Sequence, residues 1–174
     1  MNLPNKLTIA RFIAVPFFIA AYYLEWHIVA FLIFILASST DMLDGKIARK
    51  YGLVTNFGKI MDPLADKVLV YSALCLMVPD PVPAWMLIII LAREFLVAGV
   101  RTVAASEGIV IAAAMSGKIK TVLQMIAVSM LLIAPAINMS WFLILSKVVL
   151  WAALVMTVIS GVQYVTDNKQ VFSK

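Results

Sequence analysis

The sequence predicts an all-α integral membrane protein in which six transmembrane helices surround a polar cavity that faces the cytoplasm. Three observations predict this fold: the composition, the spacing of the apolar runs and the distribution of lysine and arginine. Of the 174 residues, 64% are apolar and only 13% are charged. A water-soluble domain of this size could not bury so much apolar surface. The length and the absence of a linker or an internal repeat predict a single domain over residues 1–174.

Six apolar runs, each long enough for a helix, are separated by polar residues, glycine or proline. We expect helices over residues 6–24, 28–50, 58–79, 83–107, 116–137 and 140–165. The second and fourth helices are strictly apolar only over residues 28–37 and 84–92, and then carry charges. Charged side chains are tolerated at membrane depth only around a hydrated cleft or a partner. The charged halves of these helices therefore predict the cavity.

Lysine and arginine gather on one side of the predicted helices. That side holds both termini and the loops at 51–57 and 108–115, whereas the three opposite loops contain neither residue. Because cytoplasmic loops carry the excess of positive charge, we expect both termini and the cavity on the cytoplasmic side. The net charge of +5 on this face suits anionic headgroups or phosphorylated substrates. Lys147 is an exception, and either reaches outward from the sixth helix or marks an interfacial segment.

Four aspartates lie within otherwise apolar, helix-sized stretches: Asp41, Asp44, Asp62 and Asp66. Helical spacing places the two aspartates of each stretch on one face of its helix. Four ionised carboxylates held together repel one another strongly unless cations lie between them. Because no histidine or cysteine accompanies these oxygen ligands, they predict a site for a hard divalent cation, Mg²⁺ or Mn²⁺.

Each pattern also has a simpler interpretation. Asp62 could cap the start of a helix together with the proline after it, although this leaves Asp66 unexplained. Asp44 could form an ion pair with Arg49 or Lys46, and the small residues nearby could serve helix packing alone. A transporter that relays ions or protons through the aspartates would need carboxylates across the whole membrane, and here they lie in one half.

Nine residues at fixed spacing resemble the signature of the CDP-alcohol phosphotransferase family: Asp41-x-x-Asp44-Gly45-x-x-Ala48-Arg49, then Gly58-x-x-x-Asp62-x-x-x-Asp66. Further segments, which begin at Asn2, Ala92 and Ser116, resemble the bacterial branch of this family that makes phosphatidylglycerophosphate. The similarity runs from residue 2 to about residue 135, and the last helix adds little to it.

The resemblance implies transfer of a phosphatidyl group from CDP-diacylglycerol to sn-glycerol 3-phosphate, with release of CMP. It implies metal ligation by all four aspartates, Asp41, Asp44, Asp62 and Asp66. Asp66 would also act as the general base on the acceptor hydroxyl. The expected contacts to the CDP-linked donor are Asn5, Thr8, Gly45, Ala48, Arg49, Thr55 and Gly58.

Four further cations are candidates for binding the phosphate of the acceptor. Arg93 and Arg101 can line one broad face of the fourth helix, and Lys118 and Lys120 open the fifth helix on the same side. The alternative is that these cations are ordinary residues of the positively charged membrane boundary. Arg93 lies too deep for that interpretation, and we expect Glu94 beside it to neutralise or orient it.

The family resemblance also implies the partners and the location of the protein. We expect contacts with CDP-diacylglycerol, sn-glycerol 3-phosphate and membrane lipids, a homodimer, and no binding of nucleic acid. The expected location is the bacterial inner membrane, with the active site and both termini in the cytoplasm. Close alternatives are family members whose acceptor is inositol phosphate, serine or a second lipid.

Removal of divalent ions is expected to abolish the implied transfer, because four carboxylates converge there without a soft ligand. The measurement is CMP release from CDP-diacylglycerol in excess EDTA, followed by addition of Mg²⁺ or Mn²⁺ to restore it. Full turnover in EDTA would contradict the metal site.

Overall fold

The computed structural model describes residues 3–50, 56–106, 108–109, 111–112 and 114–169. Of residues 3–5, 41–50, 56–60, 62–63 and 66, it describes the backbone only. Within the described residues the regular structure is entirely helical, which confirms the all-α class. The six helices are α1 (Leu3–Tyr23), α2 (His27–Lys50), α3 (Asn56–Leu76), α4 (Ala84–Ser106), α5 (Met115–Ile137) and α6 (Ser140–Asp167).

Turn residues end the helices close to the predicted positions. Glu25 and Asn138 have left-handed backbones, with φ of 58° and 52°, between α1 and α2 and between α5 and α6. The N–H of Asn138 closes α5 by donating to a carbonyl in its last turn. α3 ends at Leu76 rather than at the predicted residue 79. The reason is that a residue before proline avoids the helical conformation, and Pro79 and Pro81 follow.

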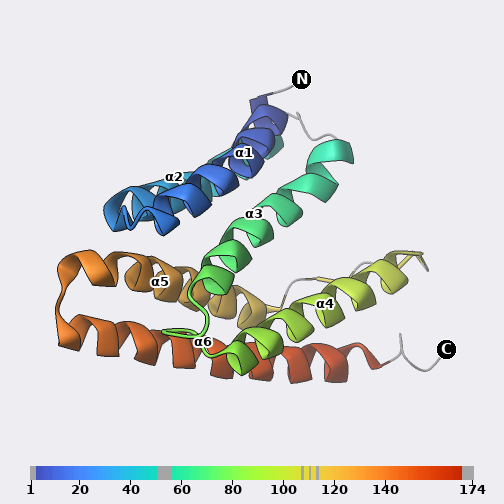
Figure 1. Ribbon diagram of the computed structural model, residues 1–174. Coiled ribbons are helices and arrows are strands. Elements are labelled where there is room, and N and C mark those ends of the chain that lie inside the picture. The colour runs from blue at the N-terminus through green and yellow to red at the C-terminus, as the bar shows by residue number, and fades with distance from the viewer. Residues whose placement is uncertain (1–2, 51–55, 107, 110, 113, 170–174) are drawn as a thin grey trace.

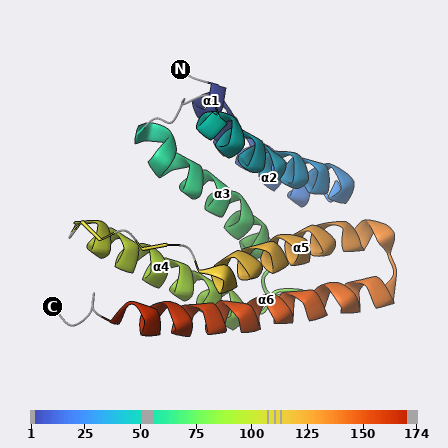
Figure 2. The same cartoon turned by 180° about the vertical axis from the view of Figure 1, so that it is seen from behind.

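Two pairs of helices are joined by α3 (Figures 1 and 2). α1 packs against α2, and α5 packs against α6, as neighbours that run in opposite directions. α3 contacts α1, α2 and α5, while α4 packs against α6. The starts of α1 and α3 and the ends of α4 and α6 lie toward the right of Figure 1. These ends belong to the side on which the sequence pattern places the lysines and arginines.

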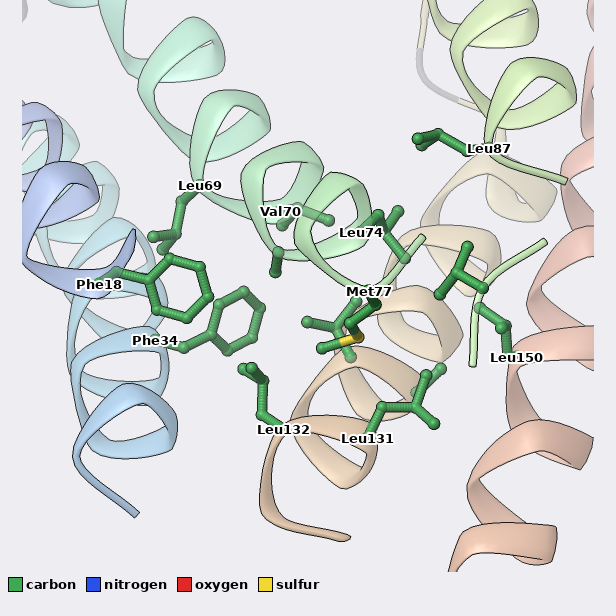
Figure 3. Close-up of a cluster of buried hydrophobic side chains, with 14 of the residues drawn as sticks. Phe18, Phe34, Leu69, Val70, Leu74, Met77, Leu87, Leu131, Leu132 and Leu150 are labelled. Carbon is green, nitrogen blue, oxygen red and sulfur yellow. The ribbon is translucent and has the colours of Figure 1, made fainter. Parts of the chain in front are cut away.

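The hydrophobic core runs from the first helix pair to the second (Figure 3). Phe18 of α1 and Phe34 of α2 are fully buried, and their ring centroids lie 6.2 Å apart. The cluster continues past Leu69 of α3 and Met77, the residue directly after α3, to Leu150 of α6. α3 is thus held on both sides by packed side chains, so its axis is fixed relative to both pairs.

Apolar segments suited to a membrane make up much of the chain. By length and composition, three helical segments among the described residues can cross a membrane: Lys6–Tyr23, Met115–Ile137 and Ser140–Asp167. Two shorter apolar segments, His27–Thr40 and Lys67–Leu76, belong to α2 and α3. Large apolar side chains are exposed along these helices, as expected of a surface that contacts lipid. The protein is an all-α membrane protein, and the crossing of the membrane by all six helices stays a prediction.

An ion pair accounts for Lys147, the cation that did not fit the charge pattern. Its Nζ atom lies 3.1 Å from Oδ1 of Asp80, in the turn between α3 and α4. Both side chains are exposed, so the pair contributes at most about 1 kcal/mol. Lys147 therefore reaches outward to the turn, away from the cationic ends of the helices.

Phe34→Ala is expected to lower the free energy of unfolding by about 2–3 kcal/mol, because it leaves a void against Phe18. Water-soluble cores lose roughly 3–5 kcal/mol for this change. The expected loss is smaller because unfolded membrane helices keep their side chains in lipid. The measurement is unfolding of the purified protein in a detergent titration followed by circular dichroism.

The control is Leu36→Ala on the same helix, where the side chain is 66% exposed. This variant should change the free energy of unfolding by no more than about 0.5 kcal/mol. Equal losses in the two variants would contradict the core arrangement.

Candidate functional site

A cavity of about 380 Å³ lies among α3, α4, α5 and α6, near their charged ends. Four of its described lining residues carry a positive charge, and one, Glu94, carries a negative charge. This balance suits a small anion. The lining residues are Lys67, Arg93, Glu94, Val97, Arg101, Ala114, Gly117, Lys118, Thr121, Val122 and Tyr164.

The structure brings three of the four predicted acceptor-site residues to this cavity. Arg93 and Arg101 of α4 line it, as does Lys118 in the first turn of α5. Lys120 is not among the lining residues: its side chain is 4% exposed and lies behind the wall, with its Nζ atom 2.5 Å from Glu94 Oε1. Residues from two helices that are distant in sequence therefore meet at one place, as the charge pattern predicts for Arg93, Arg101 and Lys118.

Glu94 is the centre of a buried ion network. Besides Lys120, its carboxylate accepts a hydrogen bond from Arg93 Nη1 at 2.7 Å. Its other oxygen, Oε2, lies 3.3 Å from the Lys67 Nζ atom of α3. The Glu94 side chain is only 9% exposed, and a buried carboxylate is stable only when it is paired and hydrogen-bonded. The prediction that Glu94 neutralises or orients Arg93 is therefore confirmed, and two further cations share the carboxylate.

Two glycines leave room for the Arg93 side chain. A Cβ atom added at Gly161 of α6 would lie 3.1 Å from Arg93 Cγ. One added at Gly117 of α5 would lie 3.3 Å from Arg93 Nη2. Both distances are shorter than ordinary van der Waals contacts, so the Arg93 side chain passes through a slot that is narrowest at these two glycines, and a Cβ atom at either would have to displace it. The buried Nε atom of Arg93 has no hydrogen-bond partner among the described residues.

Tyr164 is a polar residue of the cavity that the sequence pattern does not predict. Tyr164 lies near the end of α6, lines the cavity and is 3% exposed. Its buried hydroxyl has no hydrogen-bond partner in the described part of the chain. The guanidinium carbon of Arg101 lies 5.8 Å from the ring centroid, within cation–π range. The only signal in the sequence is a tyrosine at the charged end of an otherwise generic membrane helix.

The four aspartates of the motif lie on two helices that contact each other. The backbone places Asp41 and Asp44 in the second half of α2, and Asp62 and Asp66 in the first half of α3. Their side chains, and the predicted metal contacts with them, lie outside the described residues. Among the side chains that are described, no group of three or more His, Cys, Asp or Glu could hold a metal ion. Four carboxylates on neighbouring helices are a donor set that fits a hard divalent cation.

Buried hydrogen bonds fix α2 just before the motif begins. Arg11 of α1 is 1% exposed, and its Nε atom donates to the Ala37 carbonyl at 3.2 Å. Thr40 Oγ1 donates to the same carbonyl at 2.6 Å. The Arg11 contact holds α1 against α2 about one turn before Asp41, the first residue of the motif, and the Thr40 contact lies within α2.

The end of the motif leads directly into the cavity wall. Lys67 follows Asp66 in α3, and its ammonium group contacts Glu94. The helix that carries the last two aspartates therefore also carries one of the cavity cations. This is the link between the motif and the cavity that the described residues provide.

The predicted donor contacts lie mostly outside the described side chains. Thr8 is the exception: it is fully buried on α1 and does not line the cavity. The contacts that lie outside the described side chains are Asn5, Gly45, Ala48, Arg49, Thr55 and Gly58.

Comparisons with known proteins extend the resemblance beyond the motif. The model of the CDP-alcohol phosphatidyltransferase family matches residues 1–159. A CDP-diacylglycerol–glycerol-3-phosphate 3-phosphatidyltransferase of Bacillus subtilis (strain 168) is 45% identical, over 96% of this chain and 95% of the relative. A relative of the same name from Rickettsia bellii is 40% identical, over 98% of this chain and 97% of its own. A relative of the same name from Haemophilus influenzae is 38% identical, over 97% of this chain and 94% of the relative.

Gly161→Ala is expected to lower the free energy of unfolding by about 1 kcal/mol, because the new methyl group presses on Arg93. Gly99→Ala is the matched control on α4, since a Cβ atom there meets nothing within 4 Å. It should raise the free energy of unfolding by about 0.5–1 kcal/mol through helix propensity alone. Both are measured by unfolding in detergent. Equal stabilisation by the two substitutions would contradict the slot.

Proposed function

The chain belongs to the CDP-alcohol phosphatidyltransferase family, and we propose that it transfers the phosphatidyl group of CDP-diacylglycerol to sn-glycerol 3-phosphate. The products are phosphatidylglycerophosphate and CMP. Relatives named for this reaction align over nearly the whole chain, which supports the proposal. The observation that carries it is the cation-lined cavity whose wall begins at Lys67, directly after the last aspartate of the motif.

The cavity has the charge and the donors that the acceptor requires. sn-Glycerol 3-phosphate is small and carries up to two negative charges, and Arg101 and Lys118 offer cations to its phosphate. The Tyr164 hydroxyl offers a further hydrogen bond, because it is buried without a partner among the described residues. Arg93 contributes through its Nε atom, which is also unpaired there. A guanidinium can bind a phosphate through two parallel hydrogen bonds, which fixes its orientation.

The aspartates perform the chemistry next to this cavity. Asp41, Asp44, Asp62 and Asp66 would hold two divalent ions, Mg²⁺ or Mn²⁺. When bound, these ions would neutralise the pyrophosphate and stabilise the oxygen of the leaving CMP. Asp66 takes the proton of the acceptor hydroxyl. The hydroxyl oxygen then bonds to the phosphatidyl phosphorus, the bond from that phosphorus to the bridging oxygen breaks, and CMP leaves with that oxygen.

The donor and the membrane complete the proposal. CDP-diacylglycerol would lie along the start of α1 and the motif helices, and its contacts are Asn5, Thr8, Gly45, Ala48, Arg49, Thr55 and Gly58. The protein would lie in the bacterial inner membrane as a multi-pass homodimer, with the cavity and both termini on the cytoplasmic side. The distribution of lysine and arginine supports this orientation.

The test is CMP release by the purified protein with CDP-diacylglycerol, a divalent ion and one alcohol at a time. sn-Glycerol 3-phosphate is expected to support turnover, whereas inositol phosphate, serine and phosphatidylglycerol are expected to give only background release. Identification of the lipid product by mass spectrometry completes the assignment. Faster turnover with any other alcohol would overturn the proposed acceptor while leaving the reaction class in place.

Asp66→Asn is expected to reduce turnover by at least about 100-fold, the lower range for loss of a general base. The variant should still fold and bind CDP-diacylglycerol, because asparagine keeps the shape and an oxygen ligand. The measurements are CMP release and donor binding. Asp167→Asn, an exposed carboxylate at the end of α6, is the control and should turn over normally. Near-normal turnover of Asp66→Asn would remove Asp66 from the role of base.

A further inference from the structure

Glu94 is the one carboxylate among the described residues of a cavity that otherwise attracts anions. It lies in the middle of α4 with 7% of the residue exposed. A carboxylate that lines an anion site weakens the binding of the anion by repulsion. We therefore expect Glu94 to contribute something to the site that outweighs its repulsion of the anion.

The contacts of Glu94 show what that contribution is. Oε1 accepts from Arg93 Nη1 at 2.7 Å and from Lys120 Nζ, and Oε2 lies 3.3 Å from Lys67 Nζ. The three cations come from three helices, α3, α4 and α5. Without a carboxylate between them they would repel one another and move apart. Glu94 therefore sets where Lys67 and Arg93 lie in the cavity wall.

The remaining two cations of the wall have no such restraint. Arg101 and Lys118 line the same cavity and form no salt bridge with any described residue. The cations thus fall into two groups. Arg101 and Lys118 form no ion pair with a described residue, and Arg101 lies against the ring of Tyr164, whereas Lys67 and Arg93 are held by Glu94 together with Lys120, which does not line the wall.

From this division we propose that Glu94 is a positioning residue for the acceptor, an inference that rests on the proposed function. It holds Arg93 and Lys67 in the geometry that receives the phosphate, and it does not touch the substrate itself. Lys67 follows Asp66, so the same carboxylate also ties the proposed base segment of α3 to the phosphate site. A positioning role and a purely electrostatic role of Glu94 predict opposite changes in the acceptor KM when its charge is removed.

Glu94→Gln keeps the size of the side chain and one acceptor oxygen but removes the negative charge. If Glu94 only reduced the positive charge of the cavity, the cavity without this carboxylate would attract the acceptor more strongly, and the acceptor KM would fall. If Glu94 positions the cations, its loss releases them and raises the acceptor KM. The two roles therefore predict opposite changes in the same quantity.

The experiment measures KM for sn-glycerol 3-phosphate, KM for CDP-diacylglycerol and kcat in purified variants. It also measures binding of sn-glycerol 3-phosphate alone by calorimetry. For Glu94→Gln we expect an acceptor KM raised by about 10-fold or more, the effect of losing hydrogen bonds to a charged group. The donor KM should change by less than about 2-fold, since this network does not include the donor residues. Glu94→Asp, which keeps the charge, should recover part of the acceptor affinity.

Asp80→Asn is the matched control, because it also removes a carboxylate from an ion pair, but far from the cavity, in the turn before α4. It should leave all three constants unchanged. If Glu94→Gln fails to fold, the double variant Glu94→Gln/Lys120→Met removes the buried ammonium together with its counter-charge. The same rise in acceptor KM is expected in the double variant, because Arg93 and Lys67 still lose their anchor.

A lower or unchanged acceptor KM in the folded Glu94→Gln protein, or in the folded double variant, would overturn the positioning role. Absence of turnover with sn-glycerol 3-phosphate in the unsubstituted protein would overturn the proposed function and the positioning role with it. Arg101→Ala, measured in the same assay, separates failure of the positioning role from failure of the cavity as the acceptor site. If Arg101→Ala raises the acceptor KM and Glu94→Gln does not, the cavity is the acceptor site and Glu94 does not position it. If neither substitution changes the acceptor KM, the cavity does not bind the acceptor, and the positioning role of Glu94 falls together with the acceptor site, while the transfer reaction stands.

Discussion

A charged side chain that is buried in a largely apolar protein must meet an opposite charge or water, and this requirement determines how the charged halves of these helices are arranged. α4 carries Arg93, Glu94 and Arg101 within one helix of 23 residues. Glu94 meets the requirement by contacting cations of α3, α4 and α5, while Arg101 borders the cavity instead. The position of the cavity follows from these charges: it lies where cations outnumber the carboxylate available to pair with them.

α3 connects this polar region to the apolar core. Leu69 and Leu74 are fully buried in the cluster that joins the two helix pairs, and Lys67, within the same stretch of helix, reaches Glu94. Because packed cores resist deformation, the core fixes the axis and rotation of α3. The helix therefore presents the segment with Asp62 and Asp66 in a defined position relative to the cavity wall. The packed second half of α3 thus fixes the position of its first half, where the proposed metal ligands and base lie.

The sequence predicts the features that depend on local composition, and it does not predict which side chains meet. Six apolar runs and the turn residues near Glu25 and Asn138 specify six helices, because length, periodicity and turn preference are local properties. The positions of the cations relative to the apolar runs likewise assign the charged ends of α4 and α5 to one side of the helices. The convergence of cations from three helices on Glu94 depends on tertiary packing, as does the burial of the Lys120 ammonium group against that carboxylate. The tyrosine of α6 gave too weak a signal, since one aromatic residue in a membrane helix is ordinary.

The central claim is that the cavity beside Glu94 receives the phosphate of the acceptor. It is tested most directly by an experimental structure of the protein with sn-glycerol 3-phosphate bound. The account predicts the phosphate within hydrogen-bonding distance of Arg101 and Lys118, with Glu94 still in contact with Arg93 and Lys67. A phosphate bound outside this cavity, for example against α1 and the second half of α2, would contradict the account.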